Sequence, residues 1–214
     1  MDYHIDGHST DLAALQKRLQ STDLIPSQEP LLDDITEKMS ALAAVGVNNL
    51  ADLRAGLNSP KALAALSRSS GISADYLKLL KRTINGFFPK SRLFKDMDWL
   101  DKNTILNLKQ AGLENTHQLF DAASRGAIGS AILDKGILSE LVAISDLCRV
   151  QWVSPNYARA IAAAGFKQAS EVARADPETL TNAIASANEG AKFYKGKVGL
   201  RDVRRLVMAA GYVP

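Results

Sequence analysis

The sequence predicts an all-α protein built from tandem repeats of short helices. Alanine occurs 31 times and leucine 28 times among the 214 residues, and both are strong helix formers. Strict alternation of apolar and polar residues, which marks a half-buried strand, is almost absent. Capping residues and glycines divide the chain into apolar-periodic stretches of helical length.

The composition is that of a soluble globular protein, with 46% hydrophobic and 23% charged residues. A single cysteine, Cys148, excludes a disulfide framework and a thiolate zinc finger. No apolar run approaches the roughly 18–20 residues that span a bilayer. The acidic start of the chain lacks the apolar core of a signal peptide, so we expect a cytoplasmic protein without membrane contact.

The first part of the chain carries four apolar stripes at helical spacing, each with a start or stop signal. A proline after Ser59 suits the first turn of a helix, and glycine favours helix ends. The stripes are Leu12, Leu15 and Leu19 after a cap at Thr10; Leu31, Ile35, Met39 and Leu42 before Gly46; Leu63 and Leu66 between Ser59-Pro60 and Gly71; and Tyr76, Leu80 and Ile84 between Ser73 and Gly86.

An internal repeat with an offset of 53 residues organises the second part. The stretch from Trp99 matches the stretch from Trp152, and the match continues to Gly112 and Gly165. In both copies a capping residue, Asp101 or Ser154, predicts a helix start, and the glycine predicts a left-handed helix end. The two tryptophans just before these caps are expected to be buried core anchors.

A glycine at a predicted helix end also occurs at Gly46 and Gly211, in looser copies of the repeat. Further helices are predicted after Asp176-Pro177 and before Gly211, the last with Val203, Leu206 and Val207 on its apolar face. We expect either one continuous array or two fused lobes. By pattern the chain divides into an N-terminal extension with one helix (1–29), divergent helical repeats (30–94) and tandem repeats (95–214).

The stretch from Trp152 to Ala158, with Ile161–Phe166 and Ala175–Leu180, resembles tandem helix-hairpin-helix modules. It looks most like a bacterial and archaeal family of uncharacterised domains of this kind. Those are similar to the N-terminal domains of RadA-like recombinases and to the hairpin domains of repair nucleases. The resemblance is best over residues 95–214 and weaker over 30–94. It implies a fold of tandem helix-hairpin-helix-like (SAM-like) repeats.

The resemblance also implies phosphate binding, in which hairpin glycines let the backbone approach a nucleic-acid strand. The hairpins at 98–101 and 151–154 have no glycine, so we do not expect them to bind phosphate in this way. The segment before the last helix has two glycines among several bases and is the best candidate. Its residues are Lys192, Lys195, Gly196, Lys197, Gly199, Arg201, Arg204 and Arg205. The alternative is a solvated basic loop and helix face.

A second basic stretch includes Lys78, Lys81 and Arg82, which lie close together on one predicted helix. Phe87 and Phe88 follow it. These rings either stack on the bases of a single strand or fill the gap between two helices, and the second reading is the more usual one.

Catalytic patterns are poor, and we expect neither an enzyme nor a metal or other cofactor. The three histidines are His4, His8 and His117, and the chain has no phosphate-binding loop, dinucleotide fingerprint or nucleophile elbow. The carboxylates of Asp96, Asp98 and Asp101 cluster locally, as expected for capping and solvation rather than for a metal site.

Three functions remain open from the sequence. The leading hypothesis is a non-enzymatic module that contacts a DNA or RNA backbone without reading sequence. The alternative is a protein–protein adaptor whose hairpins have lost their phosphate grip. A weaker alternative is an accessory domain of a DNA repair nuclease. The sequence does not determine the oligomeric state.

Overall fold

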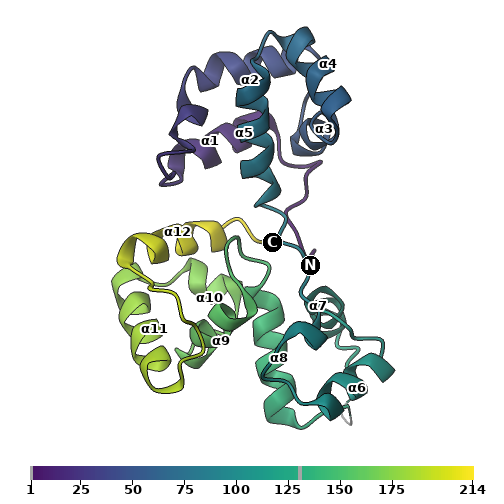
Figure 1. The fold of residues 1–214 in the computed structure, drawn as a ribbon, viewed down its shortest axis with the longest axis vertical. Helices are drawn as coiled ribbons and strands as arrows, with labels where there is room; N and C mark the ends of the chain where they lie inside the picture. Colours follow the sequence, from purple (N-terminus) through teal and green to yellow (C-terminus); the bar gives the residue numbers. More distant parts are fainter. Residues whose placement is uncertain (1, 130–131) are drawn as a thin grey trace. The chain divides into compact units, whose positions relative to one another are not determined.

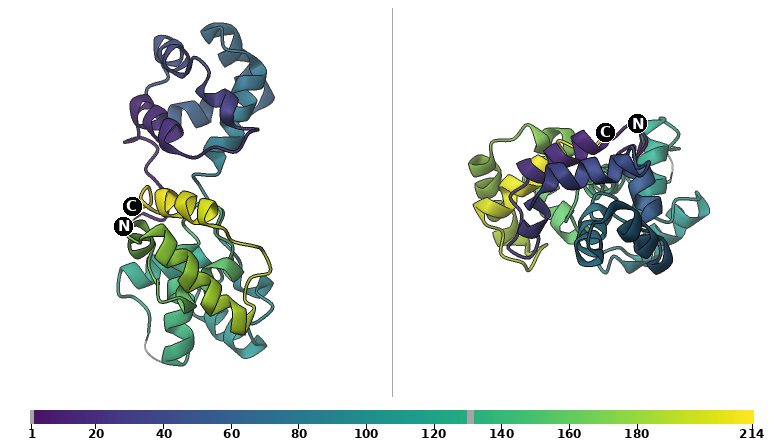
Figure 2. Two further views of the ribbon diagram at one scale, coloured as in Figure 1. Left: turned by 90° about the vertical axis from the view of Figure 1, so that its left-hand side faces the viewer. Right: turned by 90° about the horizontal axis from the view of Figure 1, so that it is seen from above.

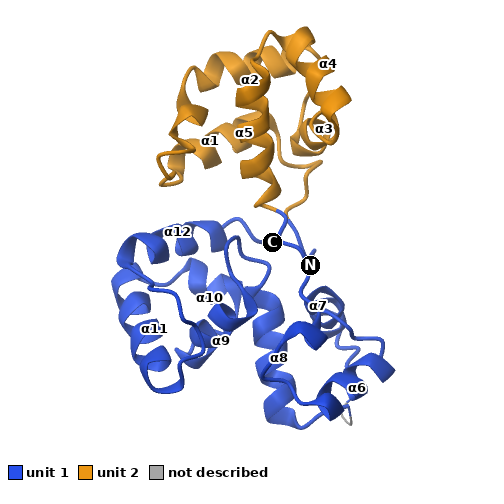
Figure 3. Cartoon of the chain, in the orientation of Figure 1, with its two compact units in different colours: residues 1–4, 88–214 blue, residues 5–87 orange. Residues whose placement is uncertain are grey.

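The computed structural model describes residues 2–129 and 132–214, and this part of the chain is all helical, as predicted. Across these residues there are twelve α-helices and two short 3-10 helices, and β-pairing is limited to two isolated bridges. The chain forms two compact units (Figure 3). Unit 2 holds residues 5–87, and unit 1 holds residues 88–214 together with the start of the chain up to His4.

Unit 2 is a bundle of five helices around a leucine-rich core (Figure 1). Its helices begin and end as the predicted caps require, with one shift. Ser59 and Ser73 each accept a backbone N–H at the predicted positions, but the first helix is capped by Asp11 rather than Thr10. The elements are α1 (Leu12–Ser21), η1 (Glu29–Leu32), α2 (Ile35–Ala44), α3 (Leu50–Gly56), α4 (Pro60–Ser70) and α5 (Ala74–Asn85).

The apolar stripes predicted for this unit form its core. Their members are all buried, and they include Leu15, Leu31, Leu42 and Leu80, which have almost no exposed surface. Helix α1 packs against α2, and α4 packs against α3 and α5. Residues 5–29 and 30–87, separated by pattern in the sequence, therefore contribute to one shared core, whereas residues 88–94 belong to unit 1.

Unit 1 is built around one apolar cluster, to which every one of its seven α-helices contributes. Helix α8 contacts α7 on one side and α9 on the other, and α12 packs on α10 and α11 (Figure 2). The elements are η2 (Phe94–Asp96), α6 (Lys102–Gln110), α7 (Thr116–Ser124), α8 (Lys135–Leu147), α9 (Pro155–Ala163), α10 (Ala169–Ala173), α11 (Pro177–Ala191) and α12 (Leu200–Ala210).

The two copies of the 53-residue repeat have the same local structure. Helices α6 and α9 begin and end at equivalent residues and are capped by Asp101 and Ser154, as predicted. Gly112 and Gly165 have φ values of +74° and +97°, the left-handed conformation expected at a helix end. In each copy the residue after the glycine donates its N–H back to the preceding helix, which completes a Schellman turn.

A third copy of this turn lies in unit 2. Gly46 has a φ of +87°, and the N–H of Val47 bonds to the carbonyl of Leu42 at 3.1 Å. Gly211 differs from the other three, because its φ is −65° and it ends α12 without a left-handed residue. The looser glycine pattern therefore identified one true structural copy and one ordinary helix end.

The prediction that both tryptophans are buried anchors is wrong for Trp152. This side chain is 48% exposed, and its backbone has a φ of +69°, a region that large side chains rarely enter. Trp99 is partly buried and packs against the core of unit 1. Trp152 and Gly71 both have a left-handed φ, and each lies two residues before the serine that caps the next helix. Trp152 therefore occupies a backbone position typical of glycine.

Candidate nucleic-acid interface

The basic segment predicted from the sequence forms the connection between α11 and α12 and the first half of α12. We call residues 192–205 the basic segment. Five of its cationic side chains are exposed: Lys192, Lys195, Lys197, Arg201 and Arg204. Within the described part of the chain, Lys192, Lys195, Lys197 and Arg204 make no ion pair, so their charge is available to an anionic partner.

Hydrogen bonds from Asn188 on α11 hold this loop in place. The Asn188 side chain accepts the backbone N–H of Tyr194 at 2.8 Å and donates to its carbonyl at 2.7 Å. Gly196 lies against the Tyr194 ring, where an added Cβ would come within 2.4 Å of a ring carbon. A side chain at this position would displace the Tyr194 ring, so Gly196 accommodates ring packing, which differs from the backbone approach to phosphate that the sequence predicts for it.

The second predicted glycine, Gly199, is the N-cap of α12. Its backbone N–H donates to the Asp202 carboxylate at 3.0 Å, so this carboxylate already satisfies a donor at the helix start. Negative charge at a helix N-terminus is favourable, and here the protein supplies it. The basic segment therefore presents side-chain cations rather than a vacant ring of glycine N–H groups.

Arg205 differs from the other cations of the segment because it is half-buried. Its guanidinium lies over the ring of Trp152, with Cζ 4.5 Å from the ring centroid. The other tryptophan has a similar partner, since the Arg159 guanidinium lies 4.5 Å from the Trp99 ring centroid. Arg159 and Arg205 each lie six residues before the glycine that follows their helix, so the two contacts occur at equivalent places in successive repeats.

One family matches this part of the chain. The family described as "Domain of unknown function (DUF4332)" covers residues 101–212, just over half of the chain. The chain belongs to the DUF4332 family. No curated protein and no solved structure matches the chain.

The DUF4332 region runs from the cap of α6 to just past the end of α12, so it contains α6, the second repeat copy with Trp152 and the whole basic segment, and it begins two residues after Trp99. Unit 2 lies outside the match. The expected membership of a family of uncharacterised domains is thus confirmed for residues 101–212.

The second basic stretch lies on α5, outside the DUF4332 region, and two of its three cations are already bonded. Lys78 pairs with Asp75 at 2.9 Å, and Lys81 donates to the Asn58 carbonyl at 3.3 Å. Arg82 is exposed. Phe87 is buried beneath the Arg18 guanidinium, so this ring fills the interior, and Phe88 is half-buried beside His4.

The carboxylate of Asp101 occupies the start of α6. It accepts the N–H groups of Asn103 and Thr104 and the Thr104 hydroxyl, and these bonds lower the pKa of Asp101, the hydroxyl bond most of all. A charged capping carboxylate would repel a phosphate here, in keeping with the sequence analysis. Ser154 caps α9 by accepting the N–H of Tyr157 at 3.3 Å.

In the part of the chain that the structure describes, the side chains considered as catalytic or metal-binding groups do not form a site, although the rings of His4 and His117 lie 6.1 Å apart. Over the residues described, no group of three or more His, Cys, Asp or Glu side chains is placed to hold a metal ion. Cys148 is buried, and burial raises the pKa of its thiol to about 12. His117 lies 3.3 Å from Asp121, one turn along α7. None of the described helices is long and apolar enough to cross a membrane.

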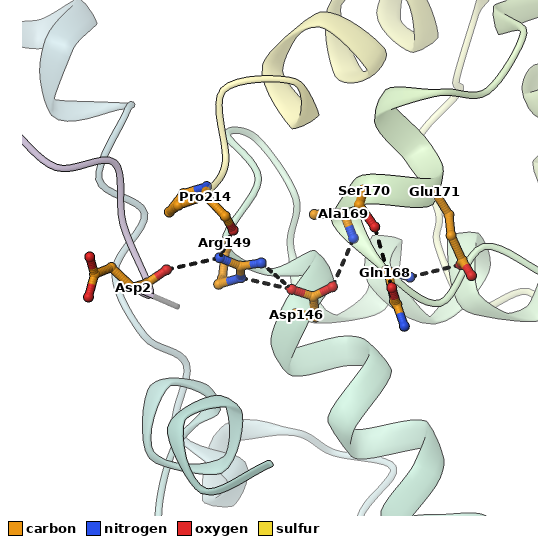
Figure 4. A network of polar contacts seen from close by, with 8 residues as sticks. All are labelled: Asp2, Asp146, Arg149, Gln168, Ala169, Ser170, Glu171 and Pro214. Carbon is orange, nitrogen blue, oxygen red and sulfur yellow. Dashed lines mark hydrogen bonds and ion pairs between the residues drawn. The ribbon is translucent and has the colours of Figure 1, made fainter. Parts of the chain in front are cut away.

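Sequence reasoning missed a buried polar network centred on Arg149, just after α8 (Figure 4). The guanidinium bonds to the Asp146 carboxylate, to the Asp2 carbonyl at 3.0 Å and to the main-chain oxygen of Pro214 at 2.9 Å. Asp146 in turn accepts the N–H of Ala169, the first residue of α10, at 2.9 Å. The network ties both ends of the described chain to the middle of unit 1.

Proposed function

We propose that this protein is a non-enzymatic module that contacts the backbone of DNA or RNA without reading its sequence. The observation that carries the proposal is the basic segment, whose exposed lysines and arginines project from one short connection and the helix that follows it. Cations of this kind bind phosphates by charge, and charge-based contacts do not distinguish one base from another.

Salt dependence is the physical signature of this mode of binding. Each phosphate that a lysine or arginine neutralises releases condensed counterions, so affinity falls as salt rises. If the five exposed cations of the segment each neutralise one phosphate, the slope of log K against log salt is about −4 to −5 on a duplex. A shallower slope would mean that fewer of these side chains take part.

We also propose that the helix pairs are degenerate helix-hairpin-helix modules, similar to those of RadA-like recombinases and repair nucleases. Left-handed backbone at Gly71 and Trp152, each followed by a serine-capped helix, supports this proposal. The carboxylates of Asp101 and Asp202 at helix starts explain why such hairpins would have lost the usual grip on phosphate. Binding would then depend on side-chain cations alone.

The proposal is tested with the triple variant Lys195→Glu, Lys197→Glu and Arg201→Glu. Fluorescence anisotropy of a labelled oligonucleotide, duplex or single-stranded, measures the affinity over a range of salt. We expect wild-type binding that weakens steeply with salt and no measurable binding by the variant. Circular dichroism checks that the variant keeps its helical content, since all three side chains are exposed.

A matched control reverses three exposed lysines elsewhere in unit 1: Lys102, Lys109 and Lys135. The change in net charge is the same, so a general charge effect would weaken both variants equally. Binding retained by the control and lost by the test variant places the contact on the basic segment. Wild-type protein that fails to bind any oligonucleotide at low salt overturns the proposal and leaves the adaptor alternative, in which only another protein binds.

A further inference from the structure

A cavity of about 180 Å³ lies beside the basic segment, within unit 1. Its wall comes from the connection before α9, from α9 itself, from the α11–α12 loop and from α12. Three aromatic rings, those of Trp152, Tyr157 and Tyr194, share it with the charged groups of Lys197, Asp202 and Arg205. The rings of Tyr157 and Tyr194 lie 5.0 Å apart at 33°, and Arg205 faces the Trp152 ring.

Two polar atoms of the residues that line this cavity are buried without a partner. They are the Tyr157 hydroxyl and Nε of Arg205, and neither makes a hydrogen bond among the described residues. Tyr157 is only 8% exposed, and its burial raises the pKa of the hydroxyl, so the group stays protonated as a donor. An unsatisfied buried polar group destabilises a fold, so its presence beside a cavity points to a missing bonding partner.

The backbone conformation of Trp152 also points to a missing partner at this cavity. A large side chain is held in a left-handed conformation and remains half exposed at the edge of the cavity, where glycine would be free of strain. Core packing does not require a side chain that is 48% exposed. Strained residues of this kind cluster at binding sites, where the surrounding structure holds them in place.

From these observations we propose that the cavity receives one unstacked nucleobase, presented by a single strand or by a free nucleotide. A base is flat and has polar edges, which suits aromatic rings beside unsatisfied donors. Trp152 and Tyr194 would stack on its face. The Tyr157 hydroxyl and the Asp202 carboxylate would bond to its edge, while Lys197 contacts the adjoining phosphate. For a strand, the inference rests on the proposed function, because the basic segment would hold the backbone.

The test uses Trp152 as its own reporter. The chain has two tryptophans, so Trp99→Phe leaves Trp152 as the only indole. Three probes are titrated: a short deoxycytidine strand, an abasic strand of the same length, and cytidine monophosphate. We expect the deoxycytidine strand to quench Trp152 fluorescence and to bind about 5- to 150-fold more tightly than the abasic strand, which is the worth of one stacked base.

The outcomes separate the two proposals. Quenching by the monophosphate without binding of either strand supports the base site and overturns backbone binding. Equal binding of the two strands without quenching overturns the base site and leaves backbone binding intact. If no probe binds or quenches, both proposals are wrong.

A second variant tests the role of the hydroxyl. Tyr157→Phe removes only an unpartnered atom, so we expect no loss of thermal stability. The deoxycytidine strand should bind about two- to tenfold more weakly, while the abasic strand binds as before. Tyr76→Phe, a buried tyrosine of unit 2 whose hydroxyl donates to the Leu31 carbonyl, serves as the control with unchanged base binding. Identical base binding by Tyr157→Phe and wild type would overturn this role for Tyr157.

Discussion

At the scale of single residues, Trp152 is the most informative position because its sequence context and its structure point in opposite directions. An apolar ring just before a helix cap is usually packed inside, and such an anchor would cost about 3–5 kcal/mol to truncate. The structure instead places it half in solvent with left-handed backbone. Trp152 is therefore not a core anchor, and the proposed base site would account for its position.

Replacing Trp152 with glycine should lower the free energy of unfolding by only about 0–2 kcal/mol. Loss of the buried half of the ring costs about 1–2 kcal/mol and loss of the Arg205 contact about 0.5–1 kcal/mol, while relief of left-handed strain returns about 1–2 kcal/mol. Urea denaturation monitored by circular dichroism measures the difference from wild type. A loss of 3 kcal/mol or more, on the order of a deleted core side chain, would mean that Trp152 is a core anchor after all.

Arg149 is the opposite case, a charged residue without which unit 1 should be much less stable. Its side chain is 3% exposed, and its partner Asp146 is 13% exposed. We expect Arg149→Met to cost about 3–5 kcal/mol, because it leaves the Asp146 carboxylate and two main-chain oxygens without their donor.

Thermal melting checks this expectation. Lys78→Met is the control, since the pair of Lys78 with Asp75 is largely exposed and should contribute about 0–1 kcal/mol. Equal melting temperatures for the two variants would show that the Arg149 network does not stabilise the fold.

At the scale of elements, the helix starts depend on capping carboxylates whose charge responds to pH. Hydrogen bonds from Thr104 hold the pKa of Asp101 below its ordinary value, and bonds from Thr179 do the same for Asp176. A carboxyl whose pKa is lowered by folding stabilises the fold fully above its unfolded pKa. That stabilisation is lost as the pH falls through the lower, folded value.

Stability should therefore decline on acidification below about pH 4, the pKa of an unperturbed aspartate. Asp101→Asn keeps a capping oxygen but cannot titrate, so its melting temperature should fall less steeply between neutral and acidic pH than that of wild type. If the melting temperatures of the two proteins fell equally on acidification, this result would contradict a charged cap at Asp101.

The sequence predicts helix ends well because their signals are local. Ser59, Asp101 and Ser154 act through N–H groups two or three residues away, and Gly112 needs only its own backbone freedom. The Arg149 network escaped prediction because it joins residues 147 and 65 positions apart. The cavity escaped for the same reason, since its wall combines two stretches of chain, 151–157 and 194–206, that are far apart in the sequence.

The start of α10 shows how a side chain replaces a main-chain acceptor. At the starts of α3 and α7, the N–H of the first helical residue, Leu50 or Thr116, bonds to a main-chain carbonyl of an earlier segment, that of Thr10 or Arg92. In α10 the equivalent N–H, that of Ala169, bonds to the Asp146 side chain instead. The repeat pattern predicted the turn, but no sequence signal showed that a buried ion pair would supply the acceptor.

At the scale of the whole molecule, the chain consists of two helical units that share a turn motif. They differ in whether their clustered basic side chains are bonded to neighbouring groups. The family match and the basic segment both fall in unit 1, whereas Lys78 and Lys81 of unit 2 are bonded within that unit. The basic stretch on α5 was predicted from its charge alone. The sequence could not show that Lys78 and Lys81 already bond to neighbouring groups. The proposed interface is therefore the basic segment and the Trp152 cavity beside it.

Amide chemical-shift mapping tests this central claim most directly. Labelled full-length protein is titrated with a short single-stranded oligonucleotide at low salt, and again after salt is raised. We predict that shifts concentrate in residues 192–205 and around Trp152 and vanish as salt rises, while residues 5–87 remain unchanged. Shifts confined to residues 5–87, or no shifts at low salt, would contradict the account.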